Sequence, residues 1–322
     1  MLIYISVFLT SLLICFLITP VIINIAKRYN IVDKPDIRKI HKEPIPRIGG
    51  LAIIISIIFT SFFYLTTLYI FDPNFLVLKY FKYKFTQILG LVISFLVILI
   101  TGILDDIKDL SAKKKLIIQL LVGNILFFTG TKVDFFIFPS DTILNNIINY
   151  IFTVLWVVGL MNAINLLDGL DGLLSGVSFI ISITLGVLAI AKGQTVLAII
   201  IFSLSGALLG FLRYNFNPAK IFLGDTGSLF IGLFMSVISI LGYFKKATFI
   251  SFVIPILIFA LPILDTILAI IRRSLKKQPI FKPDKEHLHH LLLKFGLSQK
   301  QTAIVFYVIT LLLSILVISI AK

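Results

Sequence analysis

Long hydrophobic runs separated by short polar segments make up most of this chain. Many runs reach the ~20 residues that a helix needs to cross the hydrocarbon core of a bilayer. They lack the alternation of apolar and polar positions that strands show, and in lipid a helix satisfies its own backbone groups. The runs predict about ten helices, over residues 2–25, 48–71, 86–104, 115–130, 146–163, 173–191, 195–212, 227–244, 249–271 and 303–320.

The composition agrees with an all-α, polytopic transmembrane bundle. Hydrophobic residues make up 59% of the 322 residues and charged residues 14%. A soluble globular protein is nearer half apolar and about a quarter charged. The length is therefore best explained by one integral-membrane domain over residues 1–322, and not by two soluble domains.

Charge gives the bundle a predicted orientation. The net charge of +14 would suggest nucleic acid on a soluble protein, but here positive loops that face the cytoplasm explain it better. With the N-terminus outside, 21 of the 29 Lys and Arg lie in or at the edge of five inner segments, residues 26–47, 105–114, 164–172, 213–226 and 272–302. Eleven of the 15 acids and all four histidines lie there too. This predicts a multi-pass protein of the cytoplasmic membrane with its chemistry on the cytoplasmic face and no nucleic-acid partner.

Two adjacent carboxylates, Asp105 and Asp106, come where the third predicted helix ends. A helix C-terminus carries partial negative charge, so acids there are unfavourable unless a cation offsets them. A bound metal ion or the lysines at 113–115 could supply that charge. The alternative is a solvated loop in which Asp109 caps the next helix.

Asn162, Asn165, Asp168 and Asp171 recur every three residues at the inner end of the fifth predicted helix. Residues with this spacing share a helix face. A row of amides and carboxylates facing lipid would be costly, so we expect the row to line a hydrated cavity. A polar seam between two helices is the alternative.

Asp225 stands between Gly224 and Gly227 at the predicted start of the eighth helix. Glycine-rich turns and helix N-termini attract phosphate groups. An Asp in such a place is also a good Mg²⁺ ligand, because Mg²⁺ takes one or two carboxylates together with waters and substrate phosphates. The alternative is an ordinary N-capping Asp.

Basic side chains gather in the first and last inner segments. Guanidinium groups suit diphosphates because they bind two oxygens at once, and imidazole can donate to phosphoryl oxygens. Both segments would also fit ordinary loops that hold the topology. The residues concerned are Lys42, Arg47, Arg272, Arg273, His287, His289 and His290.

Taken in order, these five segments resemble the polyprenyl-phosphate N-acetylhexosamine-1-phosphate transferase family, nearly end to end. Its phospho-MurNAc-pentapeptide transferases have a threonine-proline-threonine-methionine run before the glycine pair and three successive histidines late in the chain. Here those places hold Pro44-Ile45-Pro46-Arg47 and His287-Leu288-His289-His290. The chain is more similar to the branch that loads GlcNAc 1-phosphate onto undecaprenyl phosphate to begin a cell-envelope glycan such as wall teichoic acid or O antigen.

The resemblance implies that a UDP-N-acetylhexosamine, with UDP-GlcNAc the first choice, gives its sugar 1-phosphate to undecaprenyl phosphate and releases UMP, with Mg²⁺ or Mn²⁺ as cofactor. We therefore expect three groups of site residues. The catalytic group is Asp105, Asp106, His287, His289 and His290. The metal group is Asp225 and Asn165. The substrate-binding group is Asn162, Asp168, Asp171, Asn215, Lys42, Arg47, Arg272 and Arg273.

Two other functions remain as alternatives. One is phospho-MurNAc-pentapeptide transfer in peptidoglycan synthesis. The other is transport, in which binding groups lie near the membrane midplane, where only Asp265 is expected. The oligomeric state stays open, with a homodimer as one alternative.

Overall fold

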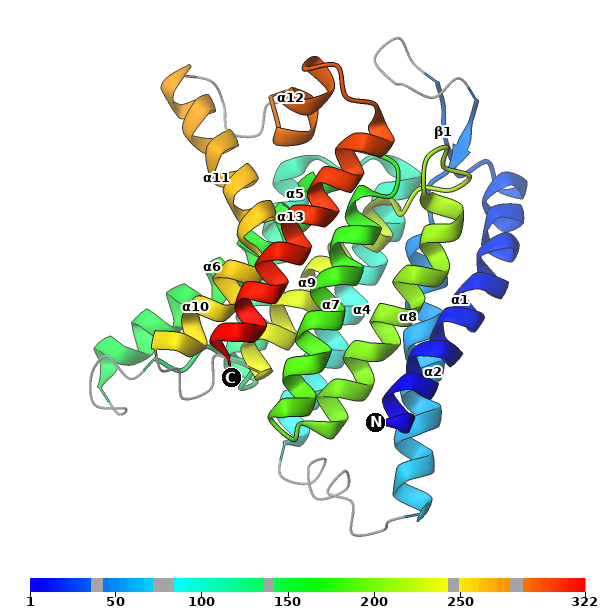
Figure 1. Ribbon diagram of the computed structural model, residues 1–322. Helices are drawn as coiled ribbons and strands as arrows, with labels where there is room; N and C mark the ends of the chain where they lie inside the picture. The colour runs from blue at the N-terminus through cyan, green and yellow to red at the C-terminus, as the bar shows by residue number, and fades with distance from the viewer. Residues whose placement is uncertain (36–42, 72–83, 136–141, 243–248, 278–285, 322) are drawn as a thin grey trace.

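The computed structural model describes residues 1–321 except 36–42, 72–83, 136–141, 243–248 and 278–285. In this part of the chain helices dominate, with one short hairpin (Figure 1). Eight helices are long and apolar enough to cross a membrane, so the predicted polytopic α-helical bundle is confirmed. They are α1 (Leu2–Arg28), α2 (Gly50–Phe71), α4 (Phe85–Lys108), α6 (Ile143–Leu167), α7 (Leu173–Ala191), α8 (Thr195–Asn215), α9 (Gly224–Gly242) and α13 (Gln299–Ile320).

Four shorter helices complete the described part: α5 (Ala112–Phe128), α10 (Phe249–Ile258), α11 (Ala260–Leu275) and α12 (Leu288–Lys294). The single helix predicted over 249–271 is instead two, α10 and α11, which part at Phe259. Pro262 explains the break, because it has no N–H to donate to the carbonyl of Ile258. Sequence analysis did not predict α12, which lies within the last inner segment.

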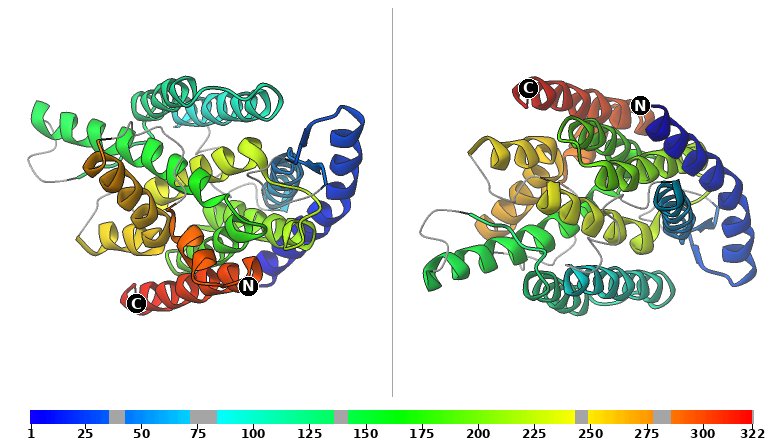
Figure 2. Two further views of the ribbon diagram at one scale, coloured as in Figure 1. Left: turned by 90° about the horizontal axis from the view of Figure 1, so that it is seen from above. Right: turned by 90° about the horizontal axis from the view of Figure 1, so that it is seen from below.

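Helix α9 lies at the centre of the bundle (Figure 2). Within an apolar stretch of 18 residues in each helix, 83% of the residues of α9 are buried, whereas in α1 and α13 the share is 28%. The outer helices present many exposed Leu, Ile and Phe side chains, as a lipid-facing surface requires. The N-terminus of α9 is therefore enclosed by other helices, and α2, α4 and α6 all contact α9.

A hairpin brings the first inner segment against the segment that precedes α9. Strand β1 (Val32–Asp33) pairs antiparallel with β2 (Ile45–Pro46). The N–H of Phe222 then donates to the carbonyl of Pro46 (2.8 Å), and the N–H of Gly49 donates to the carbonyl of Phe222 (3.0 Å). These backbone bonds fix the segment that leads into α2 beside the segment that leads into α9.

Glycines allow α2 and α4 to touch the backbone of α9 at its first turn. A Cβ added at Gly50 would lie 2.2 Å from the backbone nitrogen of Gly227, and one at Gly102 would lie 2.5 Å from the Cα of Thr226. Both atoms belong to the main chain, which cannot move aside as a flexible side chain can. The three helices are thus held at a separation that excludes any side chain at these two positions.

Gly102→Ala tests this contact. The added methyl group must push α4 away from α9, and overpacking of this kind is destabilising by roughly 1–3 kcal/mol. We expect a lower midpoint of thermal unfolding in detergent. Gly159→Ala on α6 is the matched control, because a Cβ there meets nothing within 4 Å and Ala favours a helix over Gly. Equal midpoints for the two variants would contradict the close contact.

Candidate active site

A cavity of about 1060 Å³ lies at the end of the bundle that carries β1 and α12 in Figure 1. All five predicted inner segments contribute to its lining, although they lie far apart in the sequence. The polar lining residues include Glu43, Arg47, Asp105, Asp106, Asp109, Asp168, Asp171, Asn215, Asp225 and His290. The structure therefore gathers most of the predicted site residues at one place.

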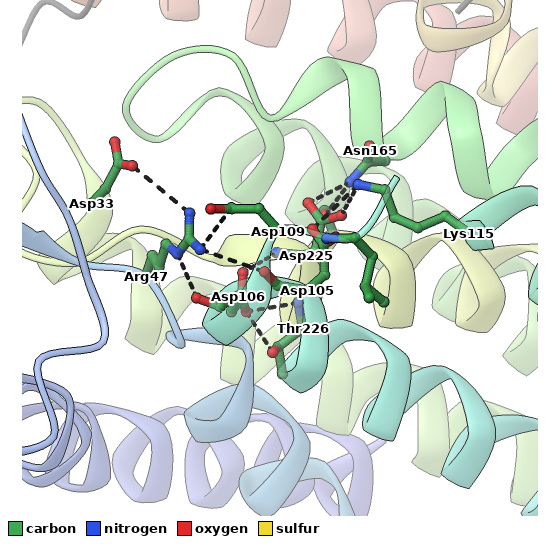
Figure 3. A network of polar contacts seen from close by, with 11 residues as sticks. Asp33, Arg47, Asp105, Asp106, Asp109, Lys115, Asn165, Asp225 and Thr226 are labelled. Carbon is green, nitrogen blue, oxygen red and sulfur yellow. Dashed lines mark hydrogen bonds and ion pairs between the residues drawn. The ribbon is translucent and has the colours of Figure 1, made fainter. Parts of the chain in front are cut away.

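Asp106 anchors the first turn of α9 (Figure 3). Its Oδ1 accepts a hydrogen bond from the backbone N–H of Asp225 at 2.8 Å. Its Oδ2 accepts one from the N–H of Thr226 at 3.0 Å and one from the Thr226 hydroxyl at 2.5 Å. A carboxylate is a favourable partner for the free N–H groups at a helix N-terminus. Asp106 is thus a capping group, supplied by α4 to α9.

Asp105 turns toward a different partner. Its Oδ2 lies 3.2 Å from the Nζ of Lys115, and the same Nζ lies 2.6 Å from Oδ2 of Asp225. The other Asp105 oxygen accepts the backbone N–H of Leu110 at 2.7 Å. One ammonium group from α5 therefore bridges carboxylates from α4 and α9 (Figure 3).

Asn165 completes this cluster. Its Nδ2 donates to Oδ1 of Asp225 at 3.1 Å and to the hydroxyl of Ser228 at 2.8 Å. The two residues predicted to hold a metal ion, Asp225 and Asn165, are therefore in direct contact. Rotation of the Asn165 amide group would bring its carbonyl oxygen to the same place.

The donor set at this cluster suits a hard cation such as Mg²⁺ or Mn²⁺ better than Zn²⁺ or Cu²⁺. Within the described residues, no three His, Cys, Asp or Glu side chains are grouped as metal ligands. The cluster offers the carboxylates of Asp105 and Asp225 and one amide, all oxygen donors. Mg²⁺ is commonly held by one or two carboxylates, with water and substrate phosphate completing its shell.

Arg47 binds the C-terminal end of α4. Its Nε donates to the carbonyl of Asp106 at 2.7 Å, and its Nη2 donates to Oδ1 of Asp109 at 2.8 Å. A cation here offsets the negative end of the helix and the acids beside it. Arg47 lines the cavity, as expected of a substrate-binding residue, but much of its donor capacity is used to hold α4.

The four residues of the predicted polar row do not all line the cavity. Asp168 lines the cavity, and burial together with the nearby carboxylates of Asp225, Asp106 and Asp171 raises its pKa to about 8. Its carboxyl therefore keeps a proton near neutral pH. Asn162 instead donates to Oε1 of Gln119 on α5 at 2.6 Å and is not part of the cavity lining.

Two more of the predicted substrate-binding residues, Asp171 and Asn215, brace the loop between α8 and α9. Oδ2 of Asp171 accepts from Nδ2 of Asn217 at 2.9 Å and from the N–H of Ala219 at 3.0 Å. Asn215, which is 3% exposed, donates to the carbonyl of Ile221 at 2.9 Å and accepts the Ser175 hydroxyl at 2.7 Å. Both residues border the cavity while shaping its wall.

The three late histidines cluster at the start of α12. His287 pairs through Nδ1 with Oδ2 of Asp265 at 2.9 Å, and the ring centroids of His289 and His290 are 4.2 Å apart. His289 is 1% exposed, and within the described residues neither of its ring nitrogens has a hydrogen-bond partner. Burial and the neighbouring histidines lower its pKa to about 4, so its ring is neutral at pH 7.

Contacts across the cavity rim tie the histidines to the polar row. A Cβ added at Gly169 would lie 2.5 Å from Nε2 of His289, so only a glycine allows α12 to sit this close to the loop between α6 and α7. His290 itself lines the cavity. His290 and Asp168 therefore line one cavity, while His289 packs against Gly169.

The remaining predicted residues are not at the cavity. Arg272 and Arg273 lie in the last turn of α11, where Arg272 is 3.5 Å from Glu286. Neither arginine is among the residues that line the cavity. Lys42 lies outside the described residues. The principal residue that sequence analysis left out of the site is Lys115. It is one of three consecutive lysines, and the sequence does not show which of the three faces the acids.

Comparison with known proteins places the chain in a family. Residues 88–243 match the model of "Glycosyl transferase family 4". The chain is 44% identical to the Bacillus subtilis protein named "Probable undecaprenyl-phosphate N-acetylglucosaminyl 1-phosphate transferase", over 96% of this chain and 82% of that protein.

Two further relatives are more distant. The Escherichia coli K12 "Undecaprenyl-phosphate alpha-N-acetylglucosaminyl 1-phosphate transferase" is 32% identical over 97% of this chain and 80% of its own length. The Mycobacterium tuberculosis H37Rv "Decaprenyl-phosphate N-acetylglucosaminephosphotransferase" is 31% identical over 93% and 78%. These relationships span nearly the whole chain, and the family match covers the acidic pair, the polar row and Asp225. The protein therefore belongs to glycosyl transferase family 4, the polyprenyl-phosphate sugar-phosphate transferases that its motifs resemble.

Proposed function

We propose that this protein transfers GlcNAc 1-phosphate from UDP-GlcNAc to undecaprenyl phosphate and releases UMP. The observation that carries the proposal is that Asp105 and Asp225 line one cavity at the end of a membrane-spanning bundle, with Asn165 bonded to Asp225. The names of the three relatives share N-acetylglucosamine phosphate transfer; two of them name undecaprenyl phosphate and one names decaprenyl phosphate. The product would be the first lipid-linked intermediate of a cell-envelope glycan such as teichoic acid or O antigen.

The charge of the cavity supports a divalent cofactor. Among the described residues, its lining includes eight Asp and Glu and three Lys and Arg. A diphosphate would be repelled from such a lining unless cations accompanied it. Asp225 and Asp105, with the amide of Asn165, are the groups that would hold Mg²⁺, or Mn²⁺ in its place. When bound, the ion would neutralise diphosphate charge as the bond to the leaving UMP breaks.

The reaction itself is a direct displacement. An oxygen of the lipid phosphate forms a bond to the β-phosphorus of the donor, and the bond from that phosphorus to the bridging oxygen breaks, so UMP leaves with the electron pair. Phosphoryl transfer depends on alignment and on charge stabilisation more than on covalent assistance. Asp105 orients the lipid phosphate or accepts its proton, whereas Asp106 positions α9.

The histidines would complete the donor side. His290 lines the cavity, and the neutral ring of His289 has one N–H to offer and one nitrogen that accepts. The Asp265 contact holds the ring of His287 and thereby the start of α12. We assign His290 to the phosphates or sugar of the donor, whereas His289, which is buried and outside the cavity lining, packs against the ring of His290.

The membrane location follows from the acceptor and the donor together. Undecaprenyl phosphate has an insoluble tail, so the enzyme must meet it at the bilayer surface, while a UDP-sugar comes from the cytosol. The excess of Lys and Arg in the inner segments predicts that the cavity faces the cytoplasm. We therefore propose a multi-pass protein of the cytoplasmic membrane with the active site on its cytoplasmic face.

A donor panel tests the proposed reaction. The full chain, purified in detergent, is given undecaprenyl phosphate and Mg²⁺, and UMP release is measured with UDP-GlcNAc, UDP-GalNAc and UDP-MurNAc-pentapeptide. We expect UDP-GlcNAc to be used at least roughly 100-fold more efficiently than the pentapeptide donor, because a site that hydrogen-bonds one sugar leaves groups unpaired with another. Faster release from UDP-MurNAc-pentapeptide would favour the peptidoglycan alternative. No release with any donor would contradict the transferase assignment.

The two adjacent acids should give different variants. In Asp105→Asn we expect turnover to fall by roughly 10²–10⁴-fold, the range for loss of a group that orients or accepts a proton, with little change in the thermal midpoint. In Asp106→Asn we expect both turnover and midpoint to fall, because an amide nitrogen replaces an oxygen that accepts from α9. Each variant thus controls for the other. Normal turnover in Asp105→Asn, or an unchanged midpoint in Asp106→Asn, would contradict these roles.

A further inference from the structure

Lys115 occupies the space between the two carboxylates of the site. Its Nζ is 2.6 Å from Oδ2 of Asp225 and 3.2 Å from Oδ2 of Asp105. The two oxygens are therefore no more than 5.8 Å apart. Two carboxylates at this separation repel one another unless a cation lies between them. In this structure the cation is the ammonium group at the start of α5.

A divalent ion bonded to both carboxylates would need the same space. Mg²⁺ binds oxygen at about 2.0–2.1 Å, so an ion that contacts both Oδ2 atoms would collide with the Lys115 nitrogen and be repelled by its charge. The lysine side chain has four flexible methylene groups, and 23% of it is exposed. The ammonium can therefore leave while α5 stays in place.

The two preceding lysines lack this geometry. Lys113 and Lys114 belong to the same first turn of α5, yet both are exposed. Since successive residues on a helix point about 100° apart, only one of the three lysines can face the cluster. The bridging position is thus specific to Lys115 and is not a general effect of a basic helix start.

We infer that Lys115 is a built-in counterion, which holds Asp105 and Asp225 together when no metal ion is bound. Mg²⁺ must displace the Lys115 ammonium group in order to bind both carboxylates. The inference rests on the metal site of the proposed function and adds a determinant of its affinity. Lys115 lowers the affinity of the site for a metal ion alone, while it keeps two facing acids from forcing α4 and α9 apart. The ammonium remains protonated when it is displaced.

Metal titration of Lys115→Met tests the inference. The full chain in detergent, without donor or acceptor, is titrated with Mg²⁺ by calorimetry, and the thermal midpoint is measured with and without the ion. We expect Lys115→Met to bind Mg²⁺ roughly tenfold more tightly or better, because a competing charge within bonding distance of the acids is gone. Without Mg²⁺, the midpoint of thermal unfolding of Lys115→Met should be lower than that of the wild type. The increase in this midpoint on adding Mg²⁺ should be larger in Lys115→Met than in the wild type.

Three further variants make the test specific. Lys114→Met removes a charge one residue away and should bind Mg²⁺ as the wild type does. Lys115→Arg keeps the charge and should remain a weak binder. Lys115→Gln repeats the main comparison if Lys115→Met does not fold. A gain in metal affinity is an effect that a merely structural lysine would not produce.

The contrary outcomes separate this inference from the proposed function. Unchanged or weaker Mg²⁺ binding in Lys115→Met and Lys115→Gln, in a protein whose wild type binds Mg²⁺ and releases UMP, overturns the counterion role alone. Absence of Mg²⁺ binding in the wild type and in every variant overturns both the counterion role and the metal site.

Discussion

The hydrogen bonds from the first turn of α9 to the carboxylate of Asp106 determine where the rest of the site lies. They fix α9 against α4, and so they set the position of Asp225 relative to the acidic pair. Gly224 allows the contact, because it has φ +68° and a Cβ there would lie 2.6 Å from both Asp106 oxygens. A buried carboxylate is tolerated here because three donors satisfy it.

The neighbouring acids Asp105 and Asp106 thus have different roles. Successive side chains on a helix point about 100° apart, so Asp106 faces α9 while Asp105 faces Lys115 on α5. Arg47 neutralises the carbonyl end of the same helix from the other side. The unfavourable placement of two acids at a helix C-terminus is therefore resolved by two cations and one helix N-terminus, each from a different segment.

Hydropathy was sufficient to predict the eight long apolar helices, since the length and apolar character of a run decide whether it can span a membrane. The division of α10 from α11 was missed because a proline within an apolar run does not always break a helix in a membrane. Asp225 was predictable as a metal ligand from its place at a glycine-rich helix start, and its pairing with Asn165 was implied by the resemblance to the transferase family. Lys115 was not, because the rotation of α5 about its axis, which brings this lysine to the acids, depends on packing that the sequence pattern does not reveal.

We thus propose that acids from α4 and α9 form one divalent-cation site in the cavity at the end of the bundle. An experimental structure of the full chain with Mn²⁺ and UDP-GlcNAc, in which the metal is located by its anomalous scattering, tests this site. We expect a Mn²⁺ peak in bonding contact with Asp225, beside Asp105 and the donor diphosphate. A peak at the histidines of α12, with none at Asp225, would contradict it.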